Sequence, residues 1–126
     1  MSDVQIKRIY DQPAATDGCR VLVDRLWPRG VKKEDAHLDA WVKDVAPSPD
    51  LRTWWNHDPE RMAEFATRYR AELTEQPESV AAVAALAGLI AQNDDAGKPT
   101  TLLYAAHDPQ VNHARILAEF LNEEPA

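Results

Sequence analysis

The chain has 126 residues, the usual length of one domain, so we expect a single domain over residues 1–126. Apolar residues make up 44% of the chain and charged residues 28%, values that are typical of globular proteins and argue against disordered, collagen-like and coiled-coil structure. The 14 Lys and Arg against 21 Asp and Glu give a formal net charge of −7, which disfavours nucleic acid and acidic membranes as partners.

The single cysteine, Cys19, has no partner for a disulfide within the chain. The first residues lack the apolar segment of a secretory signal, and no stretch approaches the roughly 18 uninterrupted apolar residues of a membrane span. The sequence therefore predicts a protein of the reducing cytoplasm, without a membrane partner.

Three segments have the composition of β-strands. In 4–10 apolar and polar residues alternate loosely, 20–24 is a β-branched run, and 100–106 is nearly all apolar, as in a strand buried on both faces. Five segments have the apolar period of helices: 38–45, 49–55, 59–73, 80–90 and 109–121. The pattern predicts an α/β sandwich with a small, mostly parallel sheet of about three strands packed by four to five helices.

The helix ends have recognisable start signals. Ser48 and Asp108 each precede a proline and are expected to cap the helices that follow, and Ser79 is expected to begin the helix over 80–90. Residues 123–126 are expected to fray beyond the last helix. Since adjacent helix positions point about 100° apart, one of Trp54 and Trp55 should be buried and the other partly exposed.

Ligands of open parallel sheets collect beyond the carboxyl ends of the strands, so a site is expected where 24–33 and 104–113 adjoin. The first segment presents Asp24, Arg25, Trp27 and Arg29, and its arginines could grip a carboxylate or phosphate while the indole offers a stacking face. Residues 1–33 also hold seven Lys and Arg against four Asp and Glu, a net charge of +3. The alternative is structural, with Asp24 and Arg25 paired to neighbouring loops and Trp27 filling the core.

The second segment presents Tyr104 at the end of the last strand, with Asn112 and His113 near the last helix. His57 could face the same cleft or bond locally. His107 and His113 could act as base and acid or as metal ligands, although six residues apart they would need partners from elsewhere. We expect no metal and no cofactor, because the sequence has neither a ligand cluster nor a phosphate-binding glycine motif. No catalytic residue is assigned.

The string Asp-Arg-Leu-Trp-Pro-Arg-Gly at 24–30 resembles the YeaO-like branch of a bacterial family, domain of unknown function 488. The resemblance spans nearly the whole chain and continues through Leu-Asp-Ala-Trp-Val-Lys-Asp-Val-Ala-Pro-Ser at 38–48, His-Asp-Pro at 57–59, Leu-Leu-Tyr-Ala-Ala at 102–106 and Asn-His-Ala at 112–114. It implies a compact cytosolic α/β domain and no established reaction.

Another branch of that family has a cysteine on the last strand and Cys-His-Arg at the following helix, where this chain has Tyr104 and Asn-His-Ala. The resemblance therefore carries over no thiol chemistry, whereas the Asp and Arg after the second strand do correspond. Cys19 stands where resembling sequences usually have an aromatic residue, which indicates a packing position.

Three functions remain open. The favoured one is a small-molecule site, with or without catalysis, in which Arg25 and Arg29 bind an anionic group opposite Tyr104, Asn112 and His113. The alternative is a non-catalytic protein-interaction module with a surface formed by Trp27, Trp54 and Trp55. A DNA-binding regulator is disfavoured, because the chain is acidic and lacks a basic recognition helix.

Overall fold

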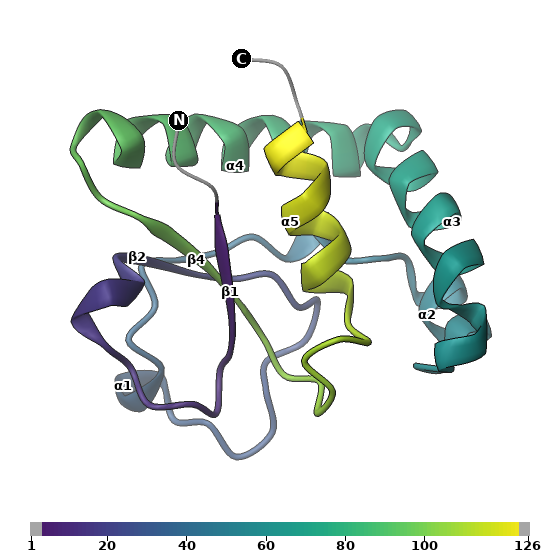
Figure 1. The fold of residues 1–126 in the computed structure, drawn as a ribbon, viewed down its shortest axis with the longest axis horizontal. Helices are drawn as coiled ribbons and strands as arrows, with labels where there is room; N and C mark the ends of the chain where they lie inside the picture. Colours follow the sequence, from purple (N-terminus) through teal and green to yellow (C-terminus); the bar gives the residue numbers. More distant parts are fainter. Residues whose placement is uncertain (1–3, 124–126) are drawn as a thin grey trace.

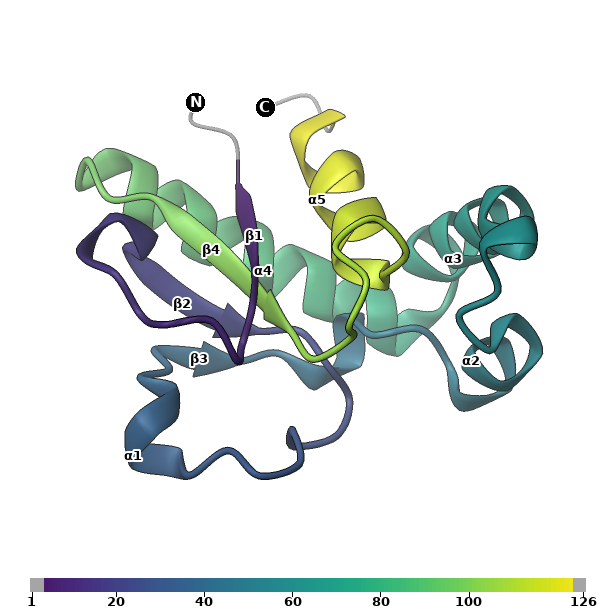
Figure 2. The same ribbon diagram turned by 60° about the horizontal axis from the view of Figure 1, so that its bottom comes forward.

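The computed structural model describes residues 4–123, and its centre is a four-stranded parallel sheet. The strands are β1 (Gln5–Arg8), β2 (Cys19–Leu22), β3 (Ala40–Trp41) and β4 (Thr100–Tyr104), in the order β1-β4-β2-β3 (Figures 1 and 2). The α/β class and the parallel sheet are as predicted, with one more strand than the three segments identified in the sequence. Of the tail expected to fray, residues 124–126 lie outside the described range.

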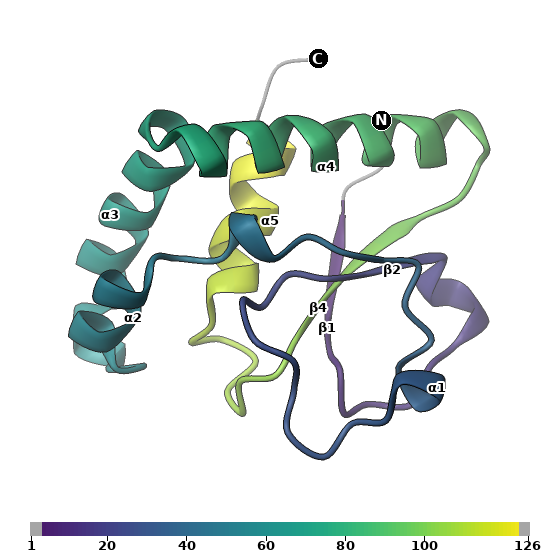
Figure 3. The ribbon, with the colours of Figure 1, turned by 180° about the vertical axis from the view of Figure 1, so that it is seen from behind.

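The α-helices of residues 4–123 are α1 (Lys33–Ala36), α2 (Pro49–Trp55), α3 (Met62–Glu75), α4 (Pro77–Asp95) and α5 (His113–Glu123). Three short 3-10 turns, η1 (Ala15–Asp17), η2 (Lys43–Val45) and η3 (Pro59–Arg61), separate some of them. The long α4 crosses the molecule and packs on α3 and η2, while α5 packs on β1, β4 and α3 (Figures 1 and 3). Within the described residues no helix combines the length and the apolarity that crossing a membrane requires.

Side chains of β2 and β4 are buried on both faces of the sheet, as the apolar run 100–106 predicted for β4. Val21 and Leu102 belong to the main core, which α3, α4 and α5 complete. Leu22 and Leu103 point to the other face and pack with Ala36 in a smaller cluster under α1 and the loop after β2. Helices thus cover one face, whereas mostly irregular chain covers the other.

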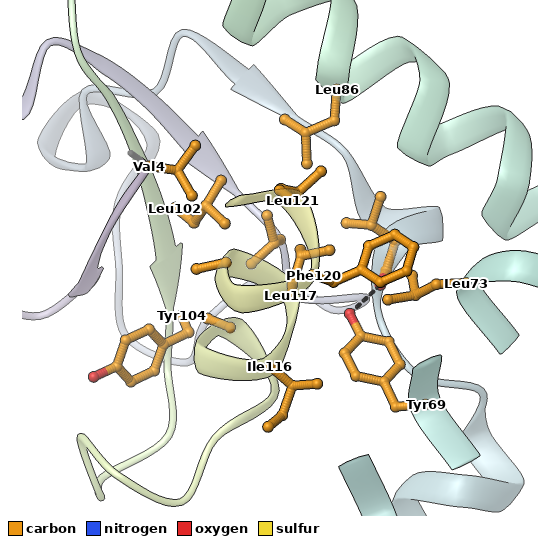
Figure 4. Packing of buried hydrophobic residues seen from close by; sticks show 14 of the residues in the cluster. Val4, Tyr69, Leu73, Leu86, Leu102, Tyr104, Ile116, Leu117, Phe120 and Leu121 are labelled. Atoms are coloured by element: carbon orange, nitrogen blue, oxygen red, sulfur yellow. Dashed lines mark hydrogen bonds between the residues drawn. The ribbon is translucent and has the colours of Figure 1, made fainter. Parts of the chain in front are cut away.

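The main core is rich in stacked aromatic rings. Trp55 and Phe65 lie 3.7 Å apart between ring centroids, and Tyr69 follows at 5.5 Å from Phe65. The Tyr69 hydroxyl donates to the backbone carbonyl of Val45, which ties α3 to η2 (Figure 4). Trp55 is only 1% exposed and Trp54 is half-buried, so the predicted difference between the adjacent tryptophans is confirmed.

The helix predicted over 38–45 is wrong. Ala40 and Trp41 form β3 and pair with Val21 and Leu22 of β2, and only η2 follows them. The apolar spacing fits a helix, but a segment this short gains little from helical hydrogen bonds alone. The segment pairs with β2 instead. The N–H groups of Asp39 and Val42 donate to the β2 carbonyl oxygens of Arg20 and Leu22, at 2.8 and 2.9 Å.

The helix starts are partly as predicted. Ser48 caps α2, since its Oγ accepts from the Leu51 N–H at 3.2 Å. Asp108 does not cap the last helix, which begins at His113 rather than at 109; its Oδ1 instead accepts from Gln110 and Val111 in a local turn. Likewise α4 begins at Pro77, two residues before Ser79. At α4 the first-turn proline, Pro77, marks the start, whereas Pro109 lies in the turn that precedes α5.

Candidate functional site

The candidate site lies at the carboxyl edge of the sheet, where β2 and β4 end side by side. Asp24 follows β2, Ala105 follows β4, and the Asp24 Oδ2 accepts a hydrogen bond from the Ala105 N–H at 3.0 Å. The two segments predicted to adjoin are therefore in direct contact. Parallel strands bring their exits together at one edge, which is why residues far apart in the sequence meet here.

His113, the first residue of α5, packs against this junction. Its Nε2 lies 3.0 Å from the Val23 carbonyl oxygen and 3.4 Å from the Asp24 Oδ1. Two acceptors around one ring nitrogen favour the tautomer with the proton on Nε2. Burial lowers the pKa of His113 and raises the pKa of Asp24, while the attraction between the two groups opposes both shifts.

Arg25 is held by the segment between β3 and α2. Its guanidinium donates from Nη2 to the Ala46 carbonyl at 3.1 Å, and Nη1 lies 3.5 Å from the Asp44 Oδ1. The Nε atom of Arg25 is buried and has no hydrogen-bond partner among the described residues. A buried N–H without a partner costs free energy, so the position of this side chain is not explained by its own hydrogen bonds alone.

Arg25 and Arg52 line one cavity of about 250 Å³. Arg52 reaches it from α2, and its charge acts on both Asp24 and His113, lowering the pKa of each. The remaining lining residues are the polar side chains of Asp24, His57 and His113 and the apolar residues Leu26, Ala46, Pro47, Ala105 and Ala106. Two fixed positive charges therefore face one carboxylate in a partly apolar hollow.

His57 lies at the border of this cavity in an unusual backbone conformation. Asn56 and His57 have φ angles of +49° and +53°, in the left-handed region that non-glycine residues seldom adopt. The His57 ring stacks on Trp55 at 4.7 Å between centroids and an angle of 23°, and the Trp55 indole N–H donates to the Asp58 carbonyl. These contacts hold a backbone turn that is costly by itself.

A second cavity, of about 290 Å³, is also lined by His57. It shares His57, Ala105 and Ala106 with the first cavity, and His107, Asp108 and Val111 complete it. We refer to the two as the arginine cavity and the side cavity.

A larger hollow of about 560 Å³ lies between η2, α2, α3 and the start of α4. Arg25 lines it as well, but among the described residues Arg68 is the only other cation in the lining, against four carboxylates from Asp44, Asp50, Glu72 and Glu78. Its charge is therefore unsuited to an anion, in contrast to the arginine cavity.

Of the eight residues predicted for the site, the arginine cavity brings together Asp24, Arg25, His57 and His113. The other four lie elsewhere. The Trp27 ring packs edge-on against Trp41, and its indole N–H donates to the Val31 carbonyl at 2.7 Å. The Arg29 side chain is exposed, while its backbone carbonyl accepts from the Tyr10 hydroxyl.

Tyr104 and Asn112 serve the fold rather than line the cavity. Tyr104 is buried in the main core, and its hydroxyl points away from that of Tyr69 (Figure 4). Asn112 is fully buried and its Oδ1 accepts from the Arg115 N–H at 2.8 Å, so it caps α5 in place of Asp108. Sequence reasoning missed Arg52, because an apolar stripe defines α2 but does not tell which distant strand end its polar side faces.

Within residues 4–123 no three side chains of His, Cys, Asp or Glu gather closely enough to hold a metal ion. The lining of the arginine cavity also includes no serine, threonine, cysteine, lysine or tyrosine among the described residues.

A family model and several similar proteins place the chain in the same family. Residues 3–126 match a family model described as "Inactive DUF488-N3 subclade". The uncharacterized protein YeaO of Escherichia coli (strain K12) is 40% identical over 119 residues, which cover 94% of this chain and 96% of YeaO. Uncharacterized proteins of Mycobacterium tuberculosis (strain H37Rv) and Mycobacterium bovis are 42% identical over 119 residues, covering 94% of this chain and 93% of each relative. No solved structure matches the chain. The chain therefore belongs to the DUF488 family, as a YeaO-like member.

Proposed function

We propose that this protein binds a small anion in the arginine cavity and does not transform it. The observation that carries the proposal is that two arginines, Arg25 and Arg52, line one cavity. Guanidinium groups bind carboxylates and phosphates through charge-assisted hydrogen bonds, and an anion between the two would engage both side chains.

The charge balance of the cavity supports an anion. Asp24 directs its oxygens to the Ala105 N–H and to His113, whose lowered pKa favours the neutral ring. Within the lining two arginines then outweigh one carboxylate, and Arg25 also has Asp44, outside the lining, at 3.5 Å.

Two observations support binding without turnover. The cavity lining described above has no hydroxyl, thiol or amine nucleophile, and the family model that matches the chain is described as inactive. The Asp24–His113 pair accordingly acts as a structural junction between β2, β4 and α5 rather than as an acid–base pair.

The test is a calorimetric titration of the purified protein with inorganic phosphate at fixed ionic strength. We expect saturable binding by the wild type and at least about tenfold weaker binding by Arg52→Gln, because a hydrogen bond to a charged group contributes roughly 1.5–3 kcal/mol. Melting temperatures of both proteins verify that the fold is retained.

Arg29→Gln is the matched control. It removes the same charge from an exposed side chain in the loop after β2, outside the cavity lining. We expect it to leave phosphate binding within about twofold of the wild type, since salt screens an exposed charge that does not contact the ligand. Absence of phosphate binding, or an equal loss in both variants, would refute an anion site at Arg52.

The second candidate function is a protein-interaction module. It is favoured by Leu26 and Trp41, which are 66% and 39% exposed. Trp55 is buried and takes no part in such a surface, and the Arg68 guanidinium stacks on the half-buried Trp54 at 4.2 Å. Under this alternative Leu26→Asp would abolish stoichiometric association with a protein partner. Arg52→Gln would leave that association unchanged.

A further inference from the structure

We propose that the ligand of this site is an anion that carries a planar ring, with its charged group in the arginine cavity and the uncharged ring in the side cavity. This inference rests on the anion site proposed above and concerns the body to which the anionic group is attached. It comes from the way in which His57, Ala105 and Ala106 serve as a common wall of both cavities.

The two cavities differ in chemistry. Of these two cavities the arginine cavity has Arg25 and Arg52 in its lining, whereas the described lining of the side cavity is Ala105, Ala106 and Val111 together with His57, His107 and Asp108. Asp108 directs its Oδ1 to the N–H groups of residues 110 and 111, within its own turn. A ligand that extends from the arginines therefore meets methyl groups and an imidazole ring next.

The shape of the wall favours a flat body. Trp55 stacks on the His57 imidazole at an angle of 23°, and His57 is an exposed residue that lines both cavities. A ligand ring lying parallel to the imidazole, on the face away from Trp55, would extend the stack formed by Trp55 and Phe65. The left-handed backbone at Asn56 and His57 holds the imidazole in this position.

The side cavity, of about 290 Å³, has room for a six-membered ring, since cavities of about 150 Å³ bind benzene. The ligand class is accordingly a phosphate or a carboxylate that carries an aryl group. The two share the same recognition chemistry, namely an anionic group for the arginines and a ring for His57.

The experiment compares matched pairs of probes by calorimetry: inorganic phosphate with phenyl phosphate, and acetate with phenylacetate. We expect the phenyl member of at least one pair to bind about tenfold more tightly, equivalent to about 1.4 kcal/mol. The pair with the tighter phenyl member identifies phosphate or carboxylate as the natural group.

Two variants separate the ring from the anion. His57→Asn removes the imidazole but keeps a residue that tolerates a positive φ, and Val111→Phe fills only the side cavity. Both should reduce the advantage of the phenyl probe to threefold or less, while binding of the small anion stays within twofold of the wild type. Melting temperatures of both variants report whether the fold is intact.

Failure of this inference is distinct from failure of the anion site. If phosphate or acetate binds through Arg52 but the phenyl probes gain nothing, or if their gain survives in both variants, the ring site is refuted and the anion site stands. If none of the four probes binds the wild type, both proposals are wrong.

Discussion

The carboxylate of Asp24 binds the backbone N–H of Ala105 across 81 residues of sequence, and so joins the exits of the two central strands. The same carboxylate lies 3.4 Å from the His113 ring at the start of α5. One side chain thus fixes two strand ends and a helix relative to one another, and the arginine cavity is formed around this junction.

Asp24→Asn is expected to lower the pKa of His113 further. The attraction of the Asp24 carboxylate raises that pKa against the effect of burial, and an asparagine Oδ1 still accepts from the Ala105 N–H. A titration of the histidine ring protons by NMR measures the shift. Asp44→Asn removes an exposed carboxylate that does not contact His113 and should leave its titration unchanged; a His113 pKa that rises in Asp24→Asn would contradict the assignment.

The stability of the fold should decrease as the pH falls below 6.5. The pKa of His113 in the folded protein lies below the value of 6.5 for a free histidine, so in this window the unfolded chain binds the proton and the folded chain does not. One such group changes the free energy of unfolding by at most about 1.4 kcal/mol per pH unit. The raised pKa of Asp24 acts in the opposite sense, since there the folded chain binds its proton first.

Urea unfolding at pH 7.5 and 5.5 measures this dependence, and His113→Asn serves as the comparison. The wild type should lose more stability than the variant between the two pH values. An equal loss in the two proteins would show that His113 is protonated in the fold.

Arg20→Leu is expected to destabilise the protein by roughly 3–5 kcal/mol, because it removes one partner of a buried ion pair. Arg20 and Asp17 are each 4% exposed, their charged atoms lie 2.5 Å apart, and Arg20 also donates to the Ala36 carbonyl. Lys7, at 3.1 Å from Asp17, would remain as its single cation. Arg115→Leu removes an arginine from an exposed pair with Glu119 and should cost at most about 1 kcal/mol; equal urea midpoints for the two variants would contradict this expectation.

Two glycines should respond oppositely to alanine. At Gly18 φ is +64° and a Cβ would lie 2.2 Å from the Pro99 carbonyl oxygen, so Gly18→Ala meets both backbone strain and a clash with main chain. Gly88 lies within α4 with no neighbouring atom within 4 Å of its would-be Cβ, so Gly88→Ala should stabilise the protein by about 0.5–1 kcal/mol. Thermal unfolding compares the two, and a stable Gly18→Ala variant would refute the close approach to Pro99.

The sequence was most informative where local pattern and burial agree. The apolar run 100–106 identified a strand buried on both faces, and the position of Asp24 after a strand identified the edge where the cavity lies. It was least informative about which residues of a strand face the core and which face the cavity. Tyr104 and Ala105 are adjacent, but the ring of Tyr104 enters the core while Ala105 lines the cavity, and alternation along a strand does not tell which set faces inward.

Long-range geometry accounts for the remaining differences. Ala40 and Trp41 have helical spacing with their neighbours, yet the free edge of β2 determines their conformation. Arg52 reaches the cavity only because the chain from Ala46 to His57 returns to the carboxyl edge of the sheet. The residues of these two segments do not reveal which distant strand they will meet, so neither outcome could be predicted from the local pattern.

The strand order also sets a constraint on folding during synthesis. β1 pairs only with β4, from Gln5 with Thr101 to Arg8 with Tyr104, and β4 lies between β1 and β2. On the ribosome the first two strands are complete long before the strand that joins them exists, and the β2–β3 ladder has only two residue pairs. Contacts of such long sequence separation form slowly. The edge of β2 that pairs with β4 therefore stays without its partner strand until residues 100–104 are made, and unpaired strand edges of this kind favour aggregation.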